Sequence, residues 1–149
     1  MSALPTPLLR SLAASLLALG ACNLTPAPEQ VTELRAWLSG ADSVPRVDST
    51  ASGTLVAGLD RQTRVLSWTL TYGGLLRPAT AAHFHGPAAV GRIGRAVHSI
   101  GDDLASPVSG SMALTPSQMA DLQAGQWYVS LSSEQNPDGE IRGQLTPRP

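Results

Sequence analysis

The segment Ala82-His83-Phe84-His85-Gly86-Pro87-Ala88 places two of the three histidines of the chain at positions i and i+2 and closes with a Gly-Pro turn. Successive side chains of an extended strand point to opposite faces, so His83 and His85 share one face and Phe84 takes the other. The segment therefore predicts a strand that an aromatic ring anchors in an apolar core. The two imidazoles on its other face either hold a metal ion or form a polar rim.

Short alternating segments occur on both sides of this strand. The clearest runs from Arg64 to Tyr72, where Leu66, Trp68 and Leu70 fall on one face with the tyrosine. Residues 60–63 and 136–139 carry turn chemistry and predict two hairpins. Similar short strands are predicted at 33–38, 53–59, 96–100, 108–114, 127–133 and 140–146.

One helix is predicted, beginning at Thr115. Thr115 suits the N-cap, Pro116 the first helical position, and Gln118 the reciprocal position of a capping box. The strands do not alternate with helices as a βαβ fold would require. The sequence therefore predicts an all-β, antiparallel β-sandwich with one short helix.

The composition narrows the classes of function. A chain of 149 residues has room for one ordinary domain, and 42% hydrophobic with 14% charged residues suits a globular protein. The formal net charge of −1 gives no electrostatic reason to expect a nucleic-acid partner. The chain has no lysine, which excludes Schiff-base chemistry, and its single cysteine, Cys22, excludes an intramolecular disulfide.

The N-terminal residues indicate export. Residues 1–21 have one positive charge, Arg10, followed by an apolar segment too short to span a bilayer. Leu19-Gly20-Ala21-Cys22 resembles a bacterial lipobox, which implies cleavage before Cys22, acylation of that cysteine and a membrane as partner. The alternative is an ordinary secretory signal with a chance cysteine. We expect residues 22–31 to form a tether and residues 32–146 the domain, outside the cytoplasm on an inner or outer membrane.

Four local patterns in a fixed order lie within residues 38–45, 82–87, 114–125 and 128–145. Together they resemble the CHRD domain, the module named for chordin, over roughly residues 32–146. The resemblance implies an immunoglobulin-like or Cu/Zn-superoxide-dismutase-like β-sandwich in a secreted or surface protein, and it carries no catalytic residues onto this chain. The residues that carry it most specifically are His83, Phe84, His85, Gly86, Pro87, Gly139, Glu140, Arg142, Gly143 and Gln144.

A metal site is one hypothesis for the histidine pair. His83 and His85 offer two nitrogen ligands that suit copper or zinc, and Glu140 is a candidate third ligand or hydrogen-bond acceptor for a ligand. His98 is a further candidate. Family members commonly carry a histidine where this chain has Ser132, so the resemblance implies that a three-histidine site lacks one ligand here. The alternative is structural: the pair hydrogen-bonds nearby groups and orders loops.

Enzymatic interpretations have weaker support. Superoxide-dismutase chemistry needs more ligands than three histidines, and Glu134, Asp138 and Glu140 lie in or beside a turn where acids are common. Glu140 and Arg142 are alternatively an ion-pair network with the histidines.

Among the tryptophans, Trp68 is expected in the core, and Trp37 and Trp127 are each compatible with core packing or with stacking on a sugar. The sequence thus predicts a non-enzymatic binding or structural module at the bacterial cell envelope, with no ligand identified; metal binding by His83 and His85 is the alternative.

Overall fold

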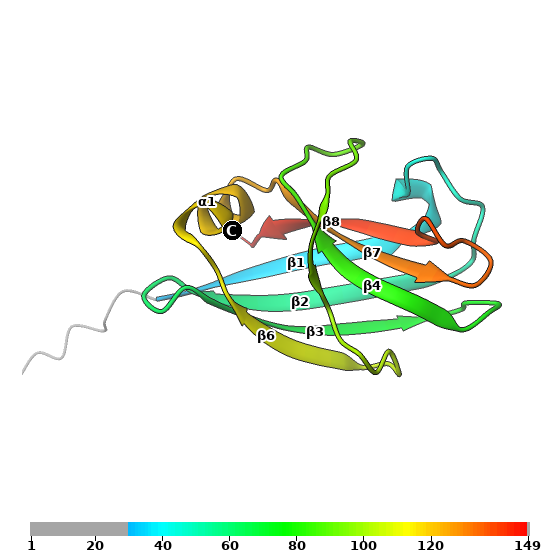
Figure 1. Cartoon of the computed structure of the whole chain (residues 1–149), viewed down its shortest axis with the longest axis horizontal. Coiled ribbons are helices and arrows are strands. Elements are labelled where there is room, and N and C mark those ends of the chain that lie inside the picture. The colour runs from blue at the N-terminus through cyan, green and yellow to red at the C-terminus, as the bar shows by residue number, and fades with distance from the viewer. Residues whose placement is uncertain (1–29, 149) are drawn as a thin grey trace, which may run out of the picture.

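The computed structural model describes residues 30–148, which form one antiparallel sheet of eight strands with a short α-helix and a 3₁₀ turn (Figure 1). The predicted lipobox and Cys22 lie outside the described residues. The strands follow the order β5-β4-β7-β8-β1-β2-β3-β6 across the sheet. The elements are β1 (Val31–Ser39), η1 (Gly40–Asp42), β2 (Ser52–Asp60), β3 (Val65–Gly73), β4 (Ala79–His85), β5 (Ala96–Ser99), β6 (Val108–Ala113), α1 (Pro116–Gln123), β7 (Trp127–Ser133) and β8 (Ile141–Pro147).

The sheet curls so that its two halves face each other across the core. Phe84 of β4 meets Trp68 of β3 edge to face with ring centroids 4.9 Å apart, although four strands separate β4 from β3 in the sheet. Trp127 of β7 also packs against Phe84, with ring centroids 5.8 Å apart. The predicted all-β antiparallel fold is confirmed. Its two layers belong to one continuous sheet, which joins them through β8 and β1.

Alternation along each strand fills this core. Leu66, Trp68 and Leu70 of β3 are buried, whereas the two residues between them, Ser67 and Thr69, are exposed. The core position of Trp68 is confirmed, and Trp127 is also buried. Trp37 is different: its side chain is 68% exposed, because it lies on the outward face of β1 opposite Thr54 of β2. The 60–63 turn joins β2 and β3 as the sequence predicts.

The predicted helix is confirmed together with its capping box. The Gln118 backbone N–H donates to Thr115 Oγ1 at 3.2 Å, and the Thr115 backbone N–H donates to Gln118 Oε1 at 2.9 Å. These two bonds satisfy donors that the first turn of a helix leaves without partners. The helix buries Leu122 against the core, and α1 thereby covers the end of the curled sheet between β6 and β7 (Figure 1).

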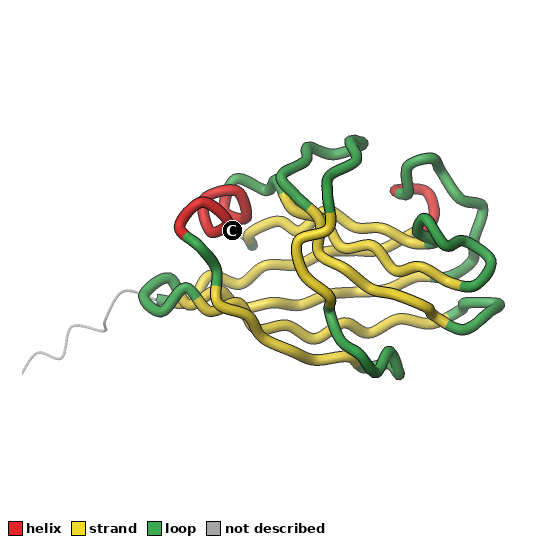
Figure 2. Tube along the Cα trace, in the orientation of Figure 1, coloured by secondary structure: helices red, strands yellow, loops and turns green. Residues whose placement is uncertain are grey.

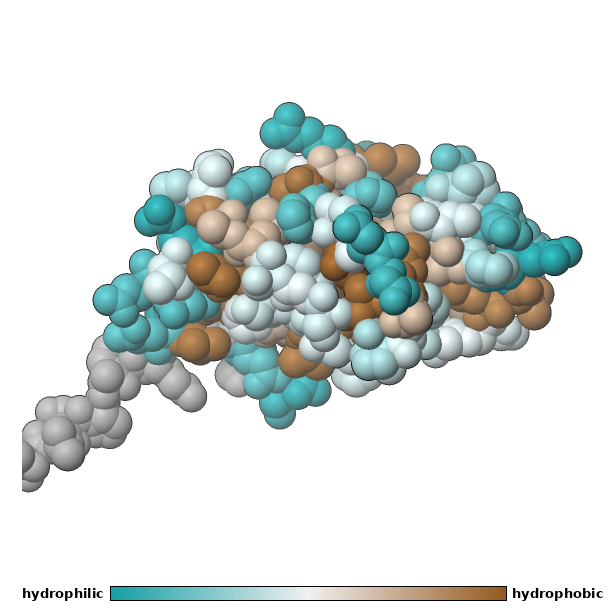
Figure 3. Space-filling model, turned by 60° about the horizontal axis from the view of Figure 1, so that its bottom comes forward, coloured by the Kyte–Doolittle hydropathy of each residue, from teal (hydrophilic) through white to brown (hydrophobic). Residues whose placement is uncertain are grey.

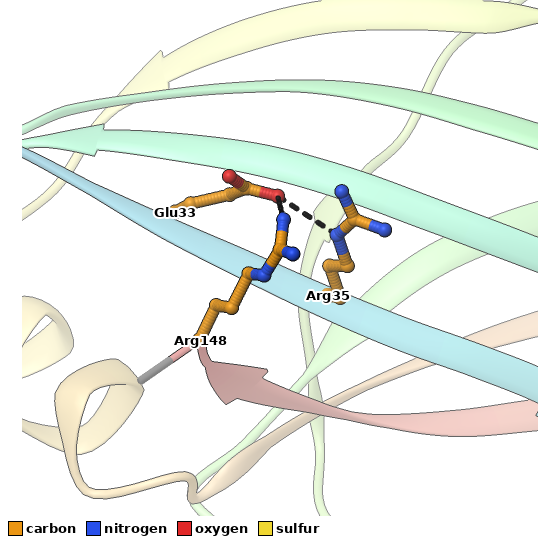
Figure 4. Close-up of polar contacts among 3 residues, drawn as sticks. All are labelled: Glu33, Arg35 and Arg148. Atoms are coloured by element: carbon orange, nitrogen blue, oxygen red, sulfur yellow. Dashed lines mark hydrogen bonds and ion pairs between the residues drawn. The ribbon is translucent and has the colours of Figure 1, made fainter.

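An ion-pair cluster joins the two ends of the described chain. Glu33 Oε1 accepts from Arg35 Nε at 2.8 Å and from Arg148 Nη1 at 3.4 Å (Figure 4). The Arg148 backbone N–H also donates to the Glu33 carbonyl at 2.8 Å. The start of β1 is therefore bonded to the residue that follows β8, and the strands extend one residue beyond each expected domain limit, to Val31 and Pro147.

Several large apolar side chains are exposed on the surface. On the face shown in Figure 3, apolar residues form separate groups among polar ones. Among residues 30–148, no helix has the length and hydropathy needed to cross a membrane.

Candidate functional site

The histidine pair lies on the outward face of β4, as its spacing predicts. His83 is opposite Ser130 of β7, and His85 is opposite Tyr128 of the same strand. The two imidazole centroids are 6.1 Å apart. Phe84 points the other way and is fully buried. The structure therefore brings the two imidazoles together on one face, beside the first half of β7.

The Gly-Pro turn after the histidines packs tightly against β7. A Cβ on Gly86 would lie 2.5 Å from Cδ1 of Trp127 and 2.9 Å from the Gln126 carbonyl oxygen, so only glycine fits. The Gly86-Pro87 peptide bond is cis. The backbone N–H of Ala88 donates to the same Gln126 carbonyl at 2.7 Å. These contacts fix the end of β4 and with it the position of His85.

Tyr128 is the centre of a three-layer stack. The His85 imidazole lies parallel to its ring, with centroids 4.8 Å apart and planes 6° apart. The Arg142 guanidinium carbon is 3.5 Å from the centroid of the same ring. Because β7 lies between β4 and β8, the imidazole and the guanidinium approach the ring from opposite neighbours. The sandwich of a cation, a phenol and an imidazole is thus built across three adjacent strands.

Hydrogen bonds to Gly94 hold the loop between β4 and β5 over this stack. The Tyr128 hydroxyl accepts from the Gly94 N–H at 3.1 Å and donates to the Gly94 carbonyl at 3.2 Å. His85 Nδ1 is 3.0 Å from the same carbonyl oxygen. A carbonyl can only accept, so Nδ1 carries the proton and Nε2 is left as an acceptor in the neutral ring. Burial lowers the pKa of His85, the bond to Gly94 opposes this effect, and the charges of His83 and Arg142 add to it.

Arg142 is a buried cation. Its side chain is only 4% exposed, and its Nη2 has no hydrogen-bond partner. No carboxylate lies within 4.0 Å of its guanidinium among the residues that the structure describes. Burial lowers the pKa of Arg142, and charges at Tyr128 and Asp42 oppose that effect. An arginine keeps its proton throughout the ordinary pH range, so a positive charge remains inside the domain.

These residues line a pocket of about 280 Å³. Two loops form its sides: the segment 43–45 that follows η1, and the β4–β5 loop with Ile93. Figure 2 shows both loops as arches on the same side of the sheet. The turn at residues 138–139 closes a third side. The floor consists of His85, Tyr128, Ser130 and Arg142.

A family model for the CHRD domain matches residues 34–145, nearly all of the described chain. The chain belongs to the CHRD domain family. No curated protein and no solved structure matched it. Membership in this family suggests a non-enzymatic module.

Glu140 of this CHRD domain does not join the histidines. Its carboxylate accepts hydrogen bonds from the hydroxyls of Ser49 and Ser133, and its backbone N–H donates to the Leu131 carbonyl. Burial raises the pKa of the Glu140 carboxyl, but the hydrogen bonds from Ser133, Ser49 and Asn136 outweigh it, so the pKa is lowered. Glu140 precedes the first residue of β8 and connects the β7–β8 turn to the segment after η1 instead of pairing with Arg142.

The remaining metal candidates of the CHRD domain are also separated from the pair. His98 of β5 is opposite the inward-pointing Phe84, and its ring meets Trp68 at 5.7 Å. Ser132 is opposite Ala81, two residue pairs further along β7 than Ser130. Among residues 30–148, no three His, Cys, Asp or Glu side chains form a group suited to a metal ion.

Two features of the pocket were not foreseen from sequence. The sequence predicts Arg142 only as part of the family pattern or of an ion-pair network with Glu140 and the histidines, and it predicts no role for Tyr128. The available signal was alternation: Ile141, Gly143 and Leu145 are buried in the core-facing register, which leaves Arg142 and Gln144 on the outward face. A buried arginine on an outward face indicates that loops cover it.

Proposed function

We propose that this CHRD domain is a non-enzymatic binding module displayed at the bacterial cell envelope and held on a membrane by acyl groups on Cys22. The observation that carries the binding role is the pocket of about 280 Å³ over Arg142, a buried cation without a carboxylate partner among the described residues. Small-molecule sites are typically concave, largely apolar and equipped with a few oriented polar groups. The pocket is small, and it combines aliphatic sides with a few polar groups.

The position of the pocket supports display on a membrane. The described chain begins next to Val31, at one end of β1, and the pocket segment 43–45 follows η1 at the other end (Figure 1). A strand of nine residues spans roughly 30 Å. A tether at Cys22 would therefore attach near the end of the domain that is remote from segment 43–45.

Two measurements test this proposal. Membrane fractions of the source cell should contain the wild-type protein, and a Cys22→Ser variant should leave them; retention of the variant would refute lipid anchoring. Amide NMR spectra of the chain should be recorded with mixtures of small anionic, cationic and neutral compounds. Binding should move the resonances of Val44, Ile93 and Ser130 together. If no compound of any class moves them, the binding role of the pocket is wrong.

Metal binding by His83 and His85 is the second candidate, favoured by their common face and the 6.1 Å between their ring centroids. Elemental analysis of the purified chain and titration with copper and zinc test it. The His83→Ala/His85→Ala double variant should abolish stoichiometric binding, and His98→Ala, on the opposite face of the sheet, is the matched control. Equal binding by the wild type and the double variant would refute this site.

A further inference from the structure

The guanidinium of Arg142 lacks the partners that a buried cation requires. Its side chain is 4% exposed, its Nη2 makes no hydrogen bond, and the ion pairs of the described residues involve other arginines. Burial of a charge is unfavourable unless the charge is paired and hydrogen-bonded. Arginine cannot relieve that cost by losing its proton. The face of the Tyr128 ring offers partial compensation through its negative quadrupole. Asp42 acts on the guanidinium only through its charge, and an anion from outside the chain would supply the absent hydrogen-bond partner.

The surroundings limit that anion to a single charge. Arg142 is the only cation among the residues that line the pocket, apart from the histidine. His85 donates its Nδ1 proton to Gly94, so that proton is not offered to a ligand in the pocket. Asp138 lies at the rim, and the charge of Asp42 also acts on Arg142, so both carboxylates would repel a second negative charge on the ligand. A single guanidinium near these carboxylates favours a monoanion over a dianion such as phosphate.

The size and lining of the pocket indicate the rest of the ligand. A volume of about 280 Å³ is at the lower end of the range for small-molecule sites. Val44, Pro45 and Ile93 line its sides with aliphatic groups. A planar carboxylate matches the fork of an arginine with two parallel hydrogen bonds. The Ser130 hydroxyl, on the floor, can donate one more.

We propose that the pocket binds a small organic monocarboxylate, with its carboxylate on the Arg142 guanidinium and its apolar body between Ile93 and the 43–45 segment. This ligand class rests on the binding function proposed above. Tyr128 positions the guanidinium, whose central carbon lies 3.5 Å from the centroid of its ring. The affinity of the monocarboxylate depends on charge, hydrogen bonding and the aliphatic lining together.

Matched pairs of acids and amides test the proposal on the full-length chain. Butyrate and benzoate are titrated beside butyramide and benzamide, with inorganic phosphate as a third arm, and binding is followed through the amide resonances of Ser130 and Ile93. The acids should bind at least about tenfold more tightly than their amides, since a hydrogen bond to a charged group is worth more than a tenfold change in affinity. Arg142→Gln should remove this preference. Arg35→Gln, which removes an arginine that pairs with Glu33 outside the pocket, should leave it unchanged.

A second set of variants changes the exposed residue Ile93, so it does not require the fold to tolerate a substitution at buried Arg142. Ile93 is 73% exposed at the side of the pocket, so its replacement does not disturb the core. Ile93→Glu should weaken butyrate binding several-fold and Ile93→Lys should strengthen it, with Ile93→Gln between them.

The outcomes separate the ligand class from the binding function. Amides that bind as tightly as acids, with no effect of Arg142→Gln, would overturn the carboxylate and leave the pocket as a binding site. Phosphate that binds more tightly than the acids would overturn the monocarboxylate in favour of a phosphate group. Failure of every compound to move the pocket resonances would overturn both proposals.

Discussion

The imidazole of His85 and the phenol ring of Tyr128 lie 4.8 Å apart and only 6° from parallel. They come from directly opposed positions on β4 and β7, and both bond to Gly94 in the loop above them. Cross-strand pairs of this kind are a main source of stability in antiparallel sheets. Here the pair has an added role, because it holds a loop over the pocket and presents a flat face to Arg142.

The coupling of this pair is measurable by a double-mutant cycle. His85→Ala and Tyr128→Leu should each lower the free energy of unfolding, and the double variant should lose about 0.5–1.5 kcal/mol less than the sum of the two. Urea unfolding of the four proteins gives the value. His98→Ala combined with Tyr128→Leu is the control, since His98 faces Trp68 on the inner side of β5. That pair should be additive within about 0.5 kcal/mol. Additivity of the His85 pair as well would show that stacking adds no stability.

His85 should make the domain less stable in mild acid. Its pKa in the folded chain is below the ordinary value of 6.5, mainly because it is buried. At a pH between the folded pKa and 6.5, the unfolded chain binds more protons at this residue than the folded chain does. The free energy of unfolding therefore falls as the pH decreases through about 6.5. The contribution of His85 to this fall ends below its folded pKa. His85→Phe keeps a flat ring on Tyr128 and should remove this slope. Unfolding midpoints between about pH 8 and pH 5 test this, and an unchanged slope in the variant would assign the effect to another group.

Glu140 should stabilise the turn that closes the pocket. Glu140→Gln keeps the shape of the side chain but replaces the charged acceptor of the Ser49 and Ser133 hydroxyls with a neutral one. We expect a loss of about 1–2 kcal/mol at pH 7, from the difference between charged and neutral hydrogen bonds. Because the folded pKa is lowered, the wild type should lose this stability as the pH falls from about 4.5 through the folded pKa, and the variant should lack that loss.

Glu134→Gln is the matched control for that variant. Glu134 lies in the same turn, but its side chain is exposed. The free energy of unfolding of the Glu134→Gln variant should differ from that of the wild type by less than about 0.5 kcal/mol. Chemical denaturation at pH 7 and pH 4 compares the three proteins. An equal loss in both variants would mean that the net charge of the turn, and not the bonds to Ser49 and Ser133, determines its stability.

Local patterns were sufficient to predict the strands, the helix and the orientation of the histidine pair. The alternation of Leu66, Trp68 and Leu70, and the capping box of Thr115 and Gln118, depend on interactions within a few residues. The sequence also places Phe84 in the core, because its neighbours on both sides are histidines.

The site was harder to predict because it depends on register between distant segments. Arg142 reaches the Tyr128 ring because Ser130 pairs with Arg142 in the β7–β8 hairpin, and that register is set by the turn. The register of β4 and β5 shifts between Phe84 and His85, and His98 comes opposite Phe84. Glu140 lies before the strand, where period-two alternation no longer applies. Each of these positions is fixed by a turn or bulge that periodicity does not encode.

Gly143, the single glycine of β8, should not be replaceable, since it lies where β8 passes close to β1. A Cβ at this position would lie 2.3 Å from the Trp37 carbonyl oxygen and 2.7 Å from its carbonyl carbon. Both are backbone atoms of a strand paired along its whole length with β2, so they cannot move aside as a side chain would. Gly143→Ala should therefore cost about 1–3 kcal/mol or prevent folding. Gly73→Ala is the control, because a Cβ there meets nothing within 4 Å, and its effect should be within about 0.5 kcal/mol. Thermal unfolding of the two variants tests this. Equal midpoints would mean that β8 and β1 separate easily, and that their close contact does not hold Arg142 in the pocket floor.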